Sequence, residues 1–226
     1  MREVVIDTET TGLDPLDGHR IVEIACLELI HHVPSGRKLH RYVNPERDIP
    51  ADAMAVHGLD AVFLAEHPPF AAIAEELTEF IAGDNLVIHN AEFDLAFINA
   101  ELARLGRGPL AGQFVDTLAV ARRRFPGAPN SLDALCRRFA IDLTARDKHG
   151  AEIDCSLLAE VYIELLGGRQ PGLDFAVSTI AAIDVMGAPQ GREPRPPRPH
   201  APSLEELAAH QAMLAAIKAP LWLSAG

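Results

Sequence analysis

The sequence predicts an α/β fold in which helices cover both faces of a mixed sheet. Two observations support this prediction. Three strand-like segments come first and form a meander, and short apolar strands then alternate with amphipathic helices. A meander supplies antiparallel neighbours, whereas strands that are separated by helices usually lie parallel, so the two together give a mixed sheet.

The strands are predicted from short apolar runs and from partial alternation of apolar and polar residues. We expect five of them, at residues 4–6, 20–30, 39–43, 86–88 and 114–115. Gly36 is expected to mark the turn between the second and the third strand.

The helices are predicted from apolar residues that recur with a helical period. The clearest case runs from Ile73 to Ile81, where apolar residues lie at i, i+4, i+7 and i+8, and it ends before Gly83. Other helices are expected at residues 93–105, through 122–124, at 132–139 and at 153–165. Residues 50–64 form a mixed segment.

Length and composition indicate a soluble protein with one good-sized core and a tail. The chain has 226 residues, of which 48% are hydrophobic and 23% are charged. No apolar run approaches the roughly 20 residues that a membrane span needs, and we expect no signal peptide because the chain begins directly with a strand. Three cysteines without a metal-type spacing fit reduced thiols in a cytoplasmic protein.

The net charge of −12 argues against strong unaided binding to nucleic acid, which depends on Lys and Arg side chains that neutralise phosphates. A nucleic-acid enzyme with this charge would need metal ions at its site and help from a partner. An enzyme that acts on small molecules would have the same charge, so charge alone does not separate these classes.

Two carboxylates, Asp7 and Glu9, follow the apolar run of the first strand. On a strand, residues i and i+2 share a face, so both side chains would point the same way. Like charges at that distance repel each other unless a cation lies between them, and Mg²⁺ or Mn²⁺ prefers oxygen ligands of this kind. The alternative is that the strand has already ended and that both acids lie in a solvated turn.

Two further acids lie at predicted helix starts. Asp94 follows a buried strand, and Asp154 lies in the first turn of the last helix of the domain. Either acid can simply complement the helix dipole. If the ends of these elements meet Asp7 and Glu9, however, the four acids form a cage for two divalent ions. His149 lies five residues before Asp154 and has the mobility and position of a general base, with an exposed surface histidine as the alternative.

Three short motifs carry a resemblance to a known family. They are D-T-E-T-T-G at 7–12, H-N-A-E-F-D at 89–94 and H-G-A-E-I-D at 149–154. In order and spacing they resemble the three exonuclease motifs of DEDDh-type 3′→5′ exonucleases. Within that family, the chain most resembles the proofreading (epsilon) subunits of bacterial DNA polymerase III. The resemblance runs from Arg2 to about Gly168, and connecting stretches at 55–58, 116–122 and 130–136 match as well.

The resemblance implies a ribonuclease-H-like mixed five-stranded sheet and a nuclease that removes mispaired 3′-terminal deoxynucleotides. Asp7, Glu9 and Asp154 would be direct ligands of two Mg²⁺ or Mn²⁺ ions, with Asp7 between the two. Asp94 would help to hold the second ion through water, and His149 would take a proton from the attacking water.

The resemblance also implies contacts with the substrate, which is a single-stranded or mismatched DNA 3′ end. His57 and Asp52 match positions that contact the terminal nucleotide, in addition to Asp7, Glu9 and Asp154. At position 52 the family pattern has Glu, so Asp52 has a shorter reach. Phe93 is interpreted as a helix anchor, with packing against a base as the alternative. Residues 122–124, all arginines, are interpreted as a solvated helix face, with a phosphate contact as the alternative.

The C-terminal part is expected to be a flexible tail that binds partners. We expect the exonuclease domain at 1–168, a clamp-binding motif and proline-rich linker at 169–202, and an amphipathic segment at 203–226. Gln170, Leu173 and Phe175 fit the Q-x-x-L-x-F pattern of peptides that bind the bacterial sliding clamp. The last segment begins with a capping box at Ser203 and resembles the family's tail that binds the polymerase alpha subunit.

Two other functions remain open from the sequence. One is a free-standing ribonuclease or DNA-repair exonuclease of the same superfamily, which would not need the tail motifs. The other is a non-catalytic brace between polymerase and clamp, against which the intact set of acids argues. No membrane partner is expected.

Overall fold

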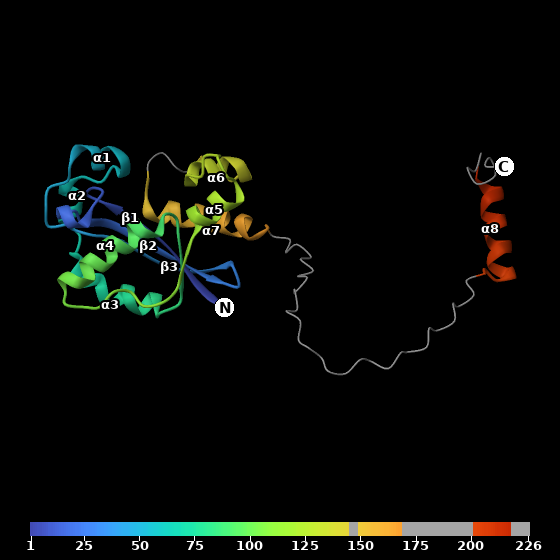
Figure 1. Ribbon diagram of the computed structural model, residues 1–226, viewed down its shortest axis with the longest axis horizontal. Helices are drawn as coiled ribbons and strands as arrows, with labels where there is room; N and C mark the ends of the chain where they lie inside the picture. Colours follow the sequence, from blue (N-terminus) through green and yellow to red (C-terminus); the bar gives the residue numbers. More distant parts are fainter. Residues whose placement is uncertain (145–148, 169–200, 218–226) are drawn as a thin grey trace, which may run out of the picture. The chain divides into compact units, whose positions relative to one another are not determined.

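The computed structural model describes residues 1–144, 149–168 and 201–217. The chain divides into two compact units, Met1–Phe175 and Ala176–Gly226. The first unit contains a five-stranded mixed sheet with helices on both faces, as predicted (Figure 1). The predicted division into three segments, at 1–168, 169–202 and 203–226, stays a prediction.

The strand β1 lies at the centre of the sheet, whose order is β3-β2-β1-β4-β5. It pairs antiparallel with β2 and parallel with β4, while β2 pairs antiparallel with β3 and β4 pairs parallel with β5. The strands are β1 (Arg2–Thr10), β2 (Ile21–Ile30), β3 (Val33–Tyr42), β4 (Asn85–Ile88) and β5 (Phe114–Asp116).

The turn between β2 and β3 lies at His31 and His32, and the prediction of a turn at Gly36 was wrong. Both histidines have positive φ angles, of 52° and 64°, as a two-residue hairpin of the primed type requires. Residues other than glycine are uncommon in this conformation, and histidine is only enriched among the exceptions, so the sequence carries a weak signal for this turn. Gly36, with φ of 88°, lies inside β3, where the pairing with β2 shifts its register. Its conformational freedom therefore permits a bulge and not the turn.

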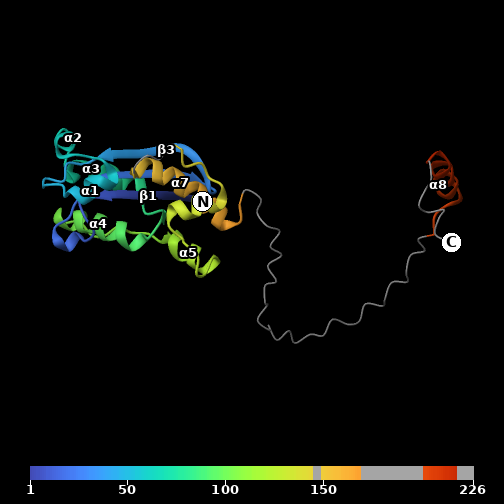
Figure 2. The ribbon, with the colours of Figure 1, turned by 90° about the horizontal axis from the view of Figure 1, so that it is seen from above.

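The long helices form two layers. One face of the sheet is covered by α3 (Phe70–Ile81) and α4 (Ala91–Arg104), and the other by α5 (Thr117–Arg124), α6 (Leu132–Phe139) and α7 (Ala151–Leu166). Side chains along β1 point alternately to the two faces and contribute to both hydrophobic cores. Val4 and Ile6 pack with the first layer, and Val5 packs with the second. The two layers can be followed in Figures 1 and 2. The predicted helical segments of this unit are all present.

Shorter helices follow the strands of the meander. They are the 3₁₀ turn η1 (Pro15–Asp17), α1 (Ala51–His57) and α2 (Ala61–Ala65), so the mixed segment 50–64 contains two short helices. Cys26, Cys136 and Cys155 are buried and form no disulfide with one another. Among the described helices, none is both long and apolar enough to cross a membrane.

The described part of the second unit is the helix α8 (Leu204–Ala216). The predicted capping box is present, because the Ser203 hydroxyl accepts a hydrogen bond from the Glu206 amide and the Glu206 carboxylate accepts one from the Ser203 amide. The clamp motif at 170–175, most of the linker and Trp222 lie outside the described residues.

Candidate active site

Asp7 and Glu9 lie on the last part of β1, beyond its pairing with β4. β4 pairs only with Glu3–Val5, whereas β2 accompanies β1 to its end. The strand continues through both acids, so they do not lie in a solvated turn. Their side chains share the face that α7 covers, and their partners across β2 are Ala25 and Glu23. The uncovered edge of β1 leaves room for side chains from α4 and α7.

Asp94 reaches this edge from α4. The chain turns sharply from β4 into α4 at Asn90, which has a left-handed backbone with φ of 67°, a conformation that asparagine tolerates. Asp94 lies in the first turn and is only 3% exposed. Its Oδ1 accepts a hydrogen bond of 2.7 Å from the Thr8 hydroxyl, which fixes the carboxylate beside β1.

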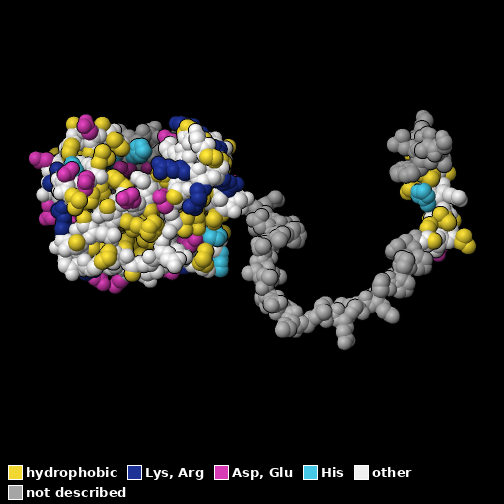
Figure 3. Space-filling view, in the orientation of Figure 1, with side chains coloured by type: hydrophobic (Ala, Val, Ile, Leu, Met, Phe, Trp, Pro, Cys, Tyr) yellow, Lys and Arg dark blue, Asp and Glu magenta, His cyan; other side chains and the backbone are white. Residues whose placement is uncertain are grey.

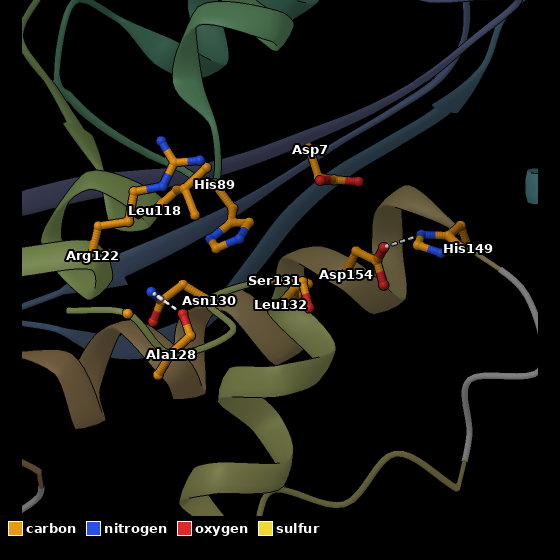
Figure 4. A pocket seen from close by; sticks show the side chains of 11 residues that line it. Asp7, His89, Leu118, Arg122, Ala128, Asn130, Ser131, Leu132, His149 and Asp154 are labelled. Atoms are coloured by element: carbon orange, nitrogen blue, oxygen red, sulfur yellow. Dashed lines mark hydrogen bonds and ion pairs between the residues drawn. The ribbon is translucent and has the colours of Figure 1, made fainter. Parts of the chain in front are cut away.

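Asp154 and His149 come from the start of α7. Asp154 is 4% exposed, and its Oδ2 lies 3.4 Å from Nδ1 of His149, whose side chain is 52% exposed (Figure 4). The backbone amide of His149 donates to the carbonyl oxygen of Val56 in α1 over 3.4 Å. Glu9, His149 and Asp154 each offer one possible ligand atom, and these three atoms lie within 4.8 Å of one another. A strand and a helix start therefore meet here, as the motif spacing predicts.

The electrostatics of the site favour a bound cation. The pKa of Asp7 is well above its ordinary value, first because burial removes water and then because Asp94, Asp154 and Glu9 repel its charge. Burial raises the pKa of Asp94 to about 7, although the hydrogen bond from Thr8 acts in the opposite direction. A divalent ion would relieve this repulsion. The carboxylate oxygens suit a hard ion such as Mg²⁺ or Mn²⁺, and the group within 4.8 Å also includes a nitrogen of His149. The residues therefore fit the ions that the motifs imply.

A cavity of about 780 Å³ opens beside the acids, and we call it the phosphate cavity. Asp7, Asp154 and His149 line one end, and Arg122 and His89 lie at the end away from His149 (Figure 4). The remaining wall comes from α5, α6 and the segment between them: Leu118, Gly127, Ala128, Asn130, Ser131 and Leu132.

His89 anchors the wall of this cavity. Its Nδ1 lies 2.9 Å from the Thr117 hydroxyl, which also donates to the Ile88 carbonyl. Burial lowers the pKa of His89, so the ring is neutral at physiological pH. The neutral ring connects the end of β4 to the start of α5 and has a structural role. Arg122 is then the cationic side chain that lines this end of the cavity.

A second cavity, of about 630 Å³, lies on the other side of the acids, and we call it the terminal cavity. It is lined by Glu9, by residues 10–14 and by α1, including Asp52 and His57. Nδ1 of His57 accepts a hydrogen bond of 3.0 Å from the Leu59 amide, which fixes the ring. Phe93 lines this cavity and also packs on Phe97 with ring centroids 5.0 Å apart. Phe93 therefore packs on its own helix as an anchor would, and it is also placed at this cavity, while its packing against a base stays a prediction.

The structure brings together most of the predicted residues. Glu9 lines the terminal cavity, while Asp7, Asp154 and His149 line the phosphate cavity, so the acids lie between the two cavities. Asp94 lines neither cavity and is joined to the site through its hydrogen bond with Thr8. The predicted clamp residues Gln170, Leu173 and Phe175 lie outside the described residues.

Three residues beside the site were not among its predicted residues. Arg122 was interpreted as part of a solvated face, with a phosphate contact as the alternative; it is exposed, and it also lines the phosphate cavity. Glu23 and His40 were treated as ordinary strand residues, but Glu23 is buried beside the acids and His40 contacts it. The one signal for Glu23 is an acid inside an otherwise apolar run, and that signal has meaning only once the register against Glu9 is known.

Comparison with known proteins gives clear relatives. An exonuclease family model matches residues 4–162, which include all three motifs. The DNA polymerase III subunit epsilon of Rickettsia felis is 51% identical over 174 residues, which cover 75% of this chain and 76% of the relative. The subunit of the same name from Escherichia coli K12 is 44% identical over 184 residues, which cover 78% of this chain and 75% of the relative.

Solved structures share the fold. Exonuclease X in complex with 5′ overhanging duplex DNA aligns with a TM-score of 0.59 and 27% identity, over 73% of this chain and 90% of that one. The nuclease domain of 3′hExo, a DEDDh family member bound to rAMP, aligns with a TM-score of 0.63 and 17% identity, over 73% of this chain and 91% of that one.

Proposed function

Because this chain belongs to the exonuclease family of DNA polymerase III epsilon subunits, we propose that its cluster of acids removes mispaired 3′-terminal deoxynucleotides during replication. The chain is a 3′→5′ exonuclease. The observation that carries the assignment of the site is the convergence of Glu9, His149 and Asp154 within 4.8 Å, beside half-buried Asp7 and buried Asp94.

The acids would hold two divalent ions, Mg²⁺ or Mn²⁺. Asp7, Glu9 and Asp154 would be the direct ligands, and of these Glu9 and Asp154 have ligand atoms within 4.8 Å of each other. Asp94 would act through water from its place on α4 beside Thr8. When bound, two such ions stabilise charge on the attacking and the leaving oxygen of a phosphodiester. The chain's own part is to hold its carboxylates at fixed places, on a buried strand and on helix starts.

His149 would act as the general base. Its contact with Asp154 orients the imidazole toward the acids, and its half-exposed position lets it return a proton to solvent after each turnover. The hydrogen bond from its backbone amide to Val56 ties the residue to α1, which also forms the terminal cavity.

The two cavities would receive successive parts of the DNA strand. The terminal cavity, with His57, Asp52 and Phe93, offers an aromatic surface and polar groups for the 3′-terminal nucleotide. The phosphate cavity, with Arg122 opposite the acids, would take the adjoining phosphates. The scissile bond would then lie between the cavities, where Asp7, Glu9 and Asp154 stand.

The proposed activity is tested with a 5′-labelled DNA oligonucleotide that is single-stranded or ends in a mismatch, with Mg²⁺ added. The wild type should give a ladder that shortens from the 3′ end. Asp154→Asn should abolish it, and His149→Ala should slow it by about 10²–10⁴-fold because the general base is lost. His31→Asn, at the hairpin turn, is the matched histidine control and should keep full activity.

The same assay separates DNA from RNA as substrate. Faster hydrolysis of an RNA strand of the same sequence would support a free-standing ribonuclease instead. A wild-type protein that makes no ladder on DNA, even with the polymerase and the clamp added, would contradict the proposal and would leave the non-catalytic brace as the better explanation.

The partners are part of the proposal. The curated relatives are named as polymerase III subunits, and we infer that α8 and the residues after it bind the polymerase alpha subunit. The described residues of this segment support this, because Leu204, Leu207 and Met213 on α8 and Ile217 at its end are exposed apolar side chains. Gln170, Leu173 and Phe175 would bind the sliding clamp. We place the protein in the cytoplasm, where the bacterial chromosome is replicated.

A further inference from the structure

A buried acid that belongs to none of the three motifs lies beside the active site. Glu23 is on β2, directly across from Glu9, and is 3% exposed. It faces the same side of the sheet as Asp7, and its charge contributes to the repulsion that raises the pKa of Asp7. Burial of a carboxylate is costly unless it has a partner, so its contacts require an explanation.

The partner of Glu23 is a histidine on the next strand. Nε2 of His40 lies 2.7 Å from Oε1 of Glu23, and the ring of Tyr42 contacts the imidazole edge to face, with centroids 4.8 Å apart. His40 comes from β3 and has no place in the exonuclease motifs. The other ring nitrogen, Nδ1, lies 3.3 Å from Oε2 of Glu152.

Glu152 carries these contacts to α7. It lies in the first turn of this helix, two residues before Asp154, and its other oxygen forms an ion pair with Lys38 of β3. Gly150, the residue before the helix, lies beside Glu23, since a methyl group at that position would stand 4.0 Å from Glu23 Oε2. The first turn of α7 therefore rests on β2 and β3 through side chains that the reaction does not itself use.

We propose that His40 and Glu152 are positioning residues for the hydrolysis. They connect Glu23 on the sheet to the first turn of α7, and this connection sets the place of Asp154 relative to Asp7. The inference rests on the proposed function, because it assigns these residues to the same acids.

The physical reason is that the acids come from separate elements. Asp7 and Glu9 are on the sheet, whereas Asp154 and His149 move with the start of α7. A displacement of that helix end by about 1 Å would alter every distance between the two groups, and errors of this size cost up to about 100-fold in rate. An ordinary structural contact on the same strand would affect stability without this loss.

The test compares kcat and KM of full-length variants on the 5′-labelled oligonucleotide with Mg²⁺. His40→Ala should lower kcat by about 10- to 100-fold and leave KM nearly unchanged, because the acids are misplaced but the cavities remain. His40→Gln, whose amide can still bond to a carboxylate, should recover much of the loss. The matched control is Arg41→Ala on the same strand. It removes the ion pair to Glu76 and a hydrogen bond to the His40 carbonyl oxygen but leaves the His40 imidazole in place, so it should keep its kcat.

A second readout needs no metal and no turnover. The backbone amide of Asp154 donates to the Gly150 carbonyl oxygen over 2.9 Å, and its hydrogen exchange reports the order of this first turn. In metal-free protein, exchange at this amide should be faster in His40→Ala than in the wild type and unchanged in Arg41→Ala. This arm tests the positioning role even if the wild type fails to degrade DNA, so the two proposals fail separately.

Three results would overturn the inference. The first is a kcat for His40→Ala that is no lower than that of Arg41→Ala, and the second is unchanged exchange at the Asp154 amide. The third concerns the double variant His40→Ala/Glu152→Ala. Its kcat should be no lower than that of the worse single variant, because both residues act through one connection, so losses of kcat that multiply would contradict the inference. Glu152→Gln, at a side chain that is 39% exposed, provides the same comparison if His40→Ala does not fold.

Discussion

The raised pKa values of two acids in the site should make the stability of the metal-free protein depend on pH. Asp94 has a folded pKa of about 7, above its ordinary value of 3.8, because it is buried. Since the folded state then binds the proton more tightly than the unfolded state, the contribution of Asp94 to stability is present below about pH 4 and is lost as the pH rises through about 7. Asp7, whose pKa is also raised, acts in the same direction.

We therefore predict that the protein in a chelator loses stability between pH 5 and pH 8, and that Asp94→Asn loses less. Asparagine can still accept the Thr8 hydrogen bond but has no charge to bury. Thermal unfolding at the two pH values, compared between wild type and variant, measures the difference. Added Mg²⁺ should restore wild-type stability at pH 8. An equal pH dependence in both proteins would mean that Asp94 ionises freely in the fold.

Arg122 gives a second prediction at this scale. If Arg122 contacts a phosphate, Arg122→Ala should raise KM by about fivefold and leave kcat unchanged. The slope of the logarithm of the binding constant against the logarithm of the salt concentration should fall by about 1, as expected for the loss of one phosphate contact. Arg123→Ala is the control, because the neighbouring side chain does not line the phosphate cavity. The same change in both variants would indicate a general charge effect.

Among the elements, α7 connects the site to the far end of the sheet. At its first turn, Cys155 contacts the Ala25 carbonyl oxygen, and near its last turn Tyr162 donates a hydrogen bond of 2.8 Å to the buried carboxylate of Glu3. Glu3 also lies 2.7 Å from Nδ1 of His32 at the hairpin turn. The helix is therefore fixed to β1 and β2 along its whole length.

We predict that Tyr162→Phe destabilises the protein by about 1–3 kcal/mol, because a buried carboxylate loses a hydrogen-bond donor while the packing of the ring is kept. Urea unfolding of wild type and variant measures this change. The kcat on DNA should stay within about twofold, since the first turn of α7 has its own contacts to the sheet. A variant with normal stability would show that His32 alone satisfies Glu3.

At the same scale, the sequence could predict the elements but not the contacts between them. Apolar periodicity located the strands and long helices, and the motifs placed Asp7 in the last part of β1 and Asp94 and Asp154 at helix starts. The hairpin turn was misplaced because two histidines adopt a conformation that favours glycine. The chain from Glu23 through His40 to Glu152 could not be predicted, because it depends on strand register and on a helix more than a hundred positions further along.

Over the molecule as a whole, charge is unevenly distributed. The net charge is −12, yet Lys and Arg side chains gather over α5 and α6 on the face in Figure 3. Part of this group is structural, since Arg124 donates to the last carbonyls of α7 and Arg138 stacks on Phe125. Few cations are then left to hold phosphates, so the exonuclease domain by itself should hold DNA weakly, with a shallow dependence on salt.

Weak binding by the domain gives the C-terminal segment its expected role. If residues 203–226 bind the polymerase and 170–175 bind the clamp, the tether raises the effective concentration of the nuclease at the primer end without any new contact to DNA. We predict that removal of residues 203–226 leaves hydrolysis of a free oligonucleotide unchanged but abolishes co-purification with the alpha subunit. Correction of a mismatched primer by the assembled polymerase should fall by about 10²-fold or more.

The double variant Gln170→Ala/Phe175→Ala should weaken clamp binding and leave the alpha subunit bound. A truncated chain that still co-purifies with the alpha subunit would place the polymerase contact on the exonuclease domain itself.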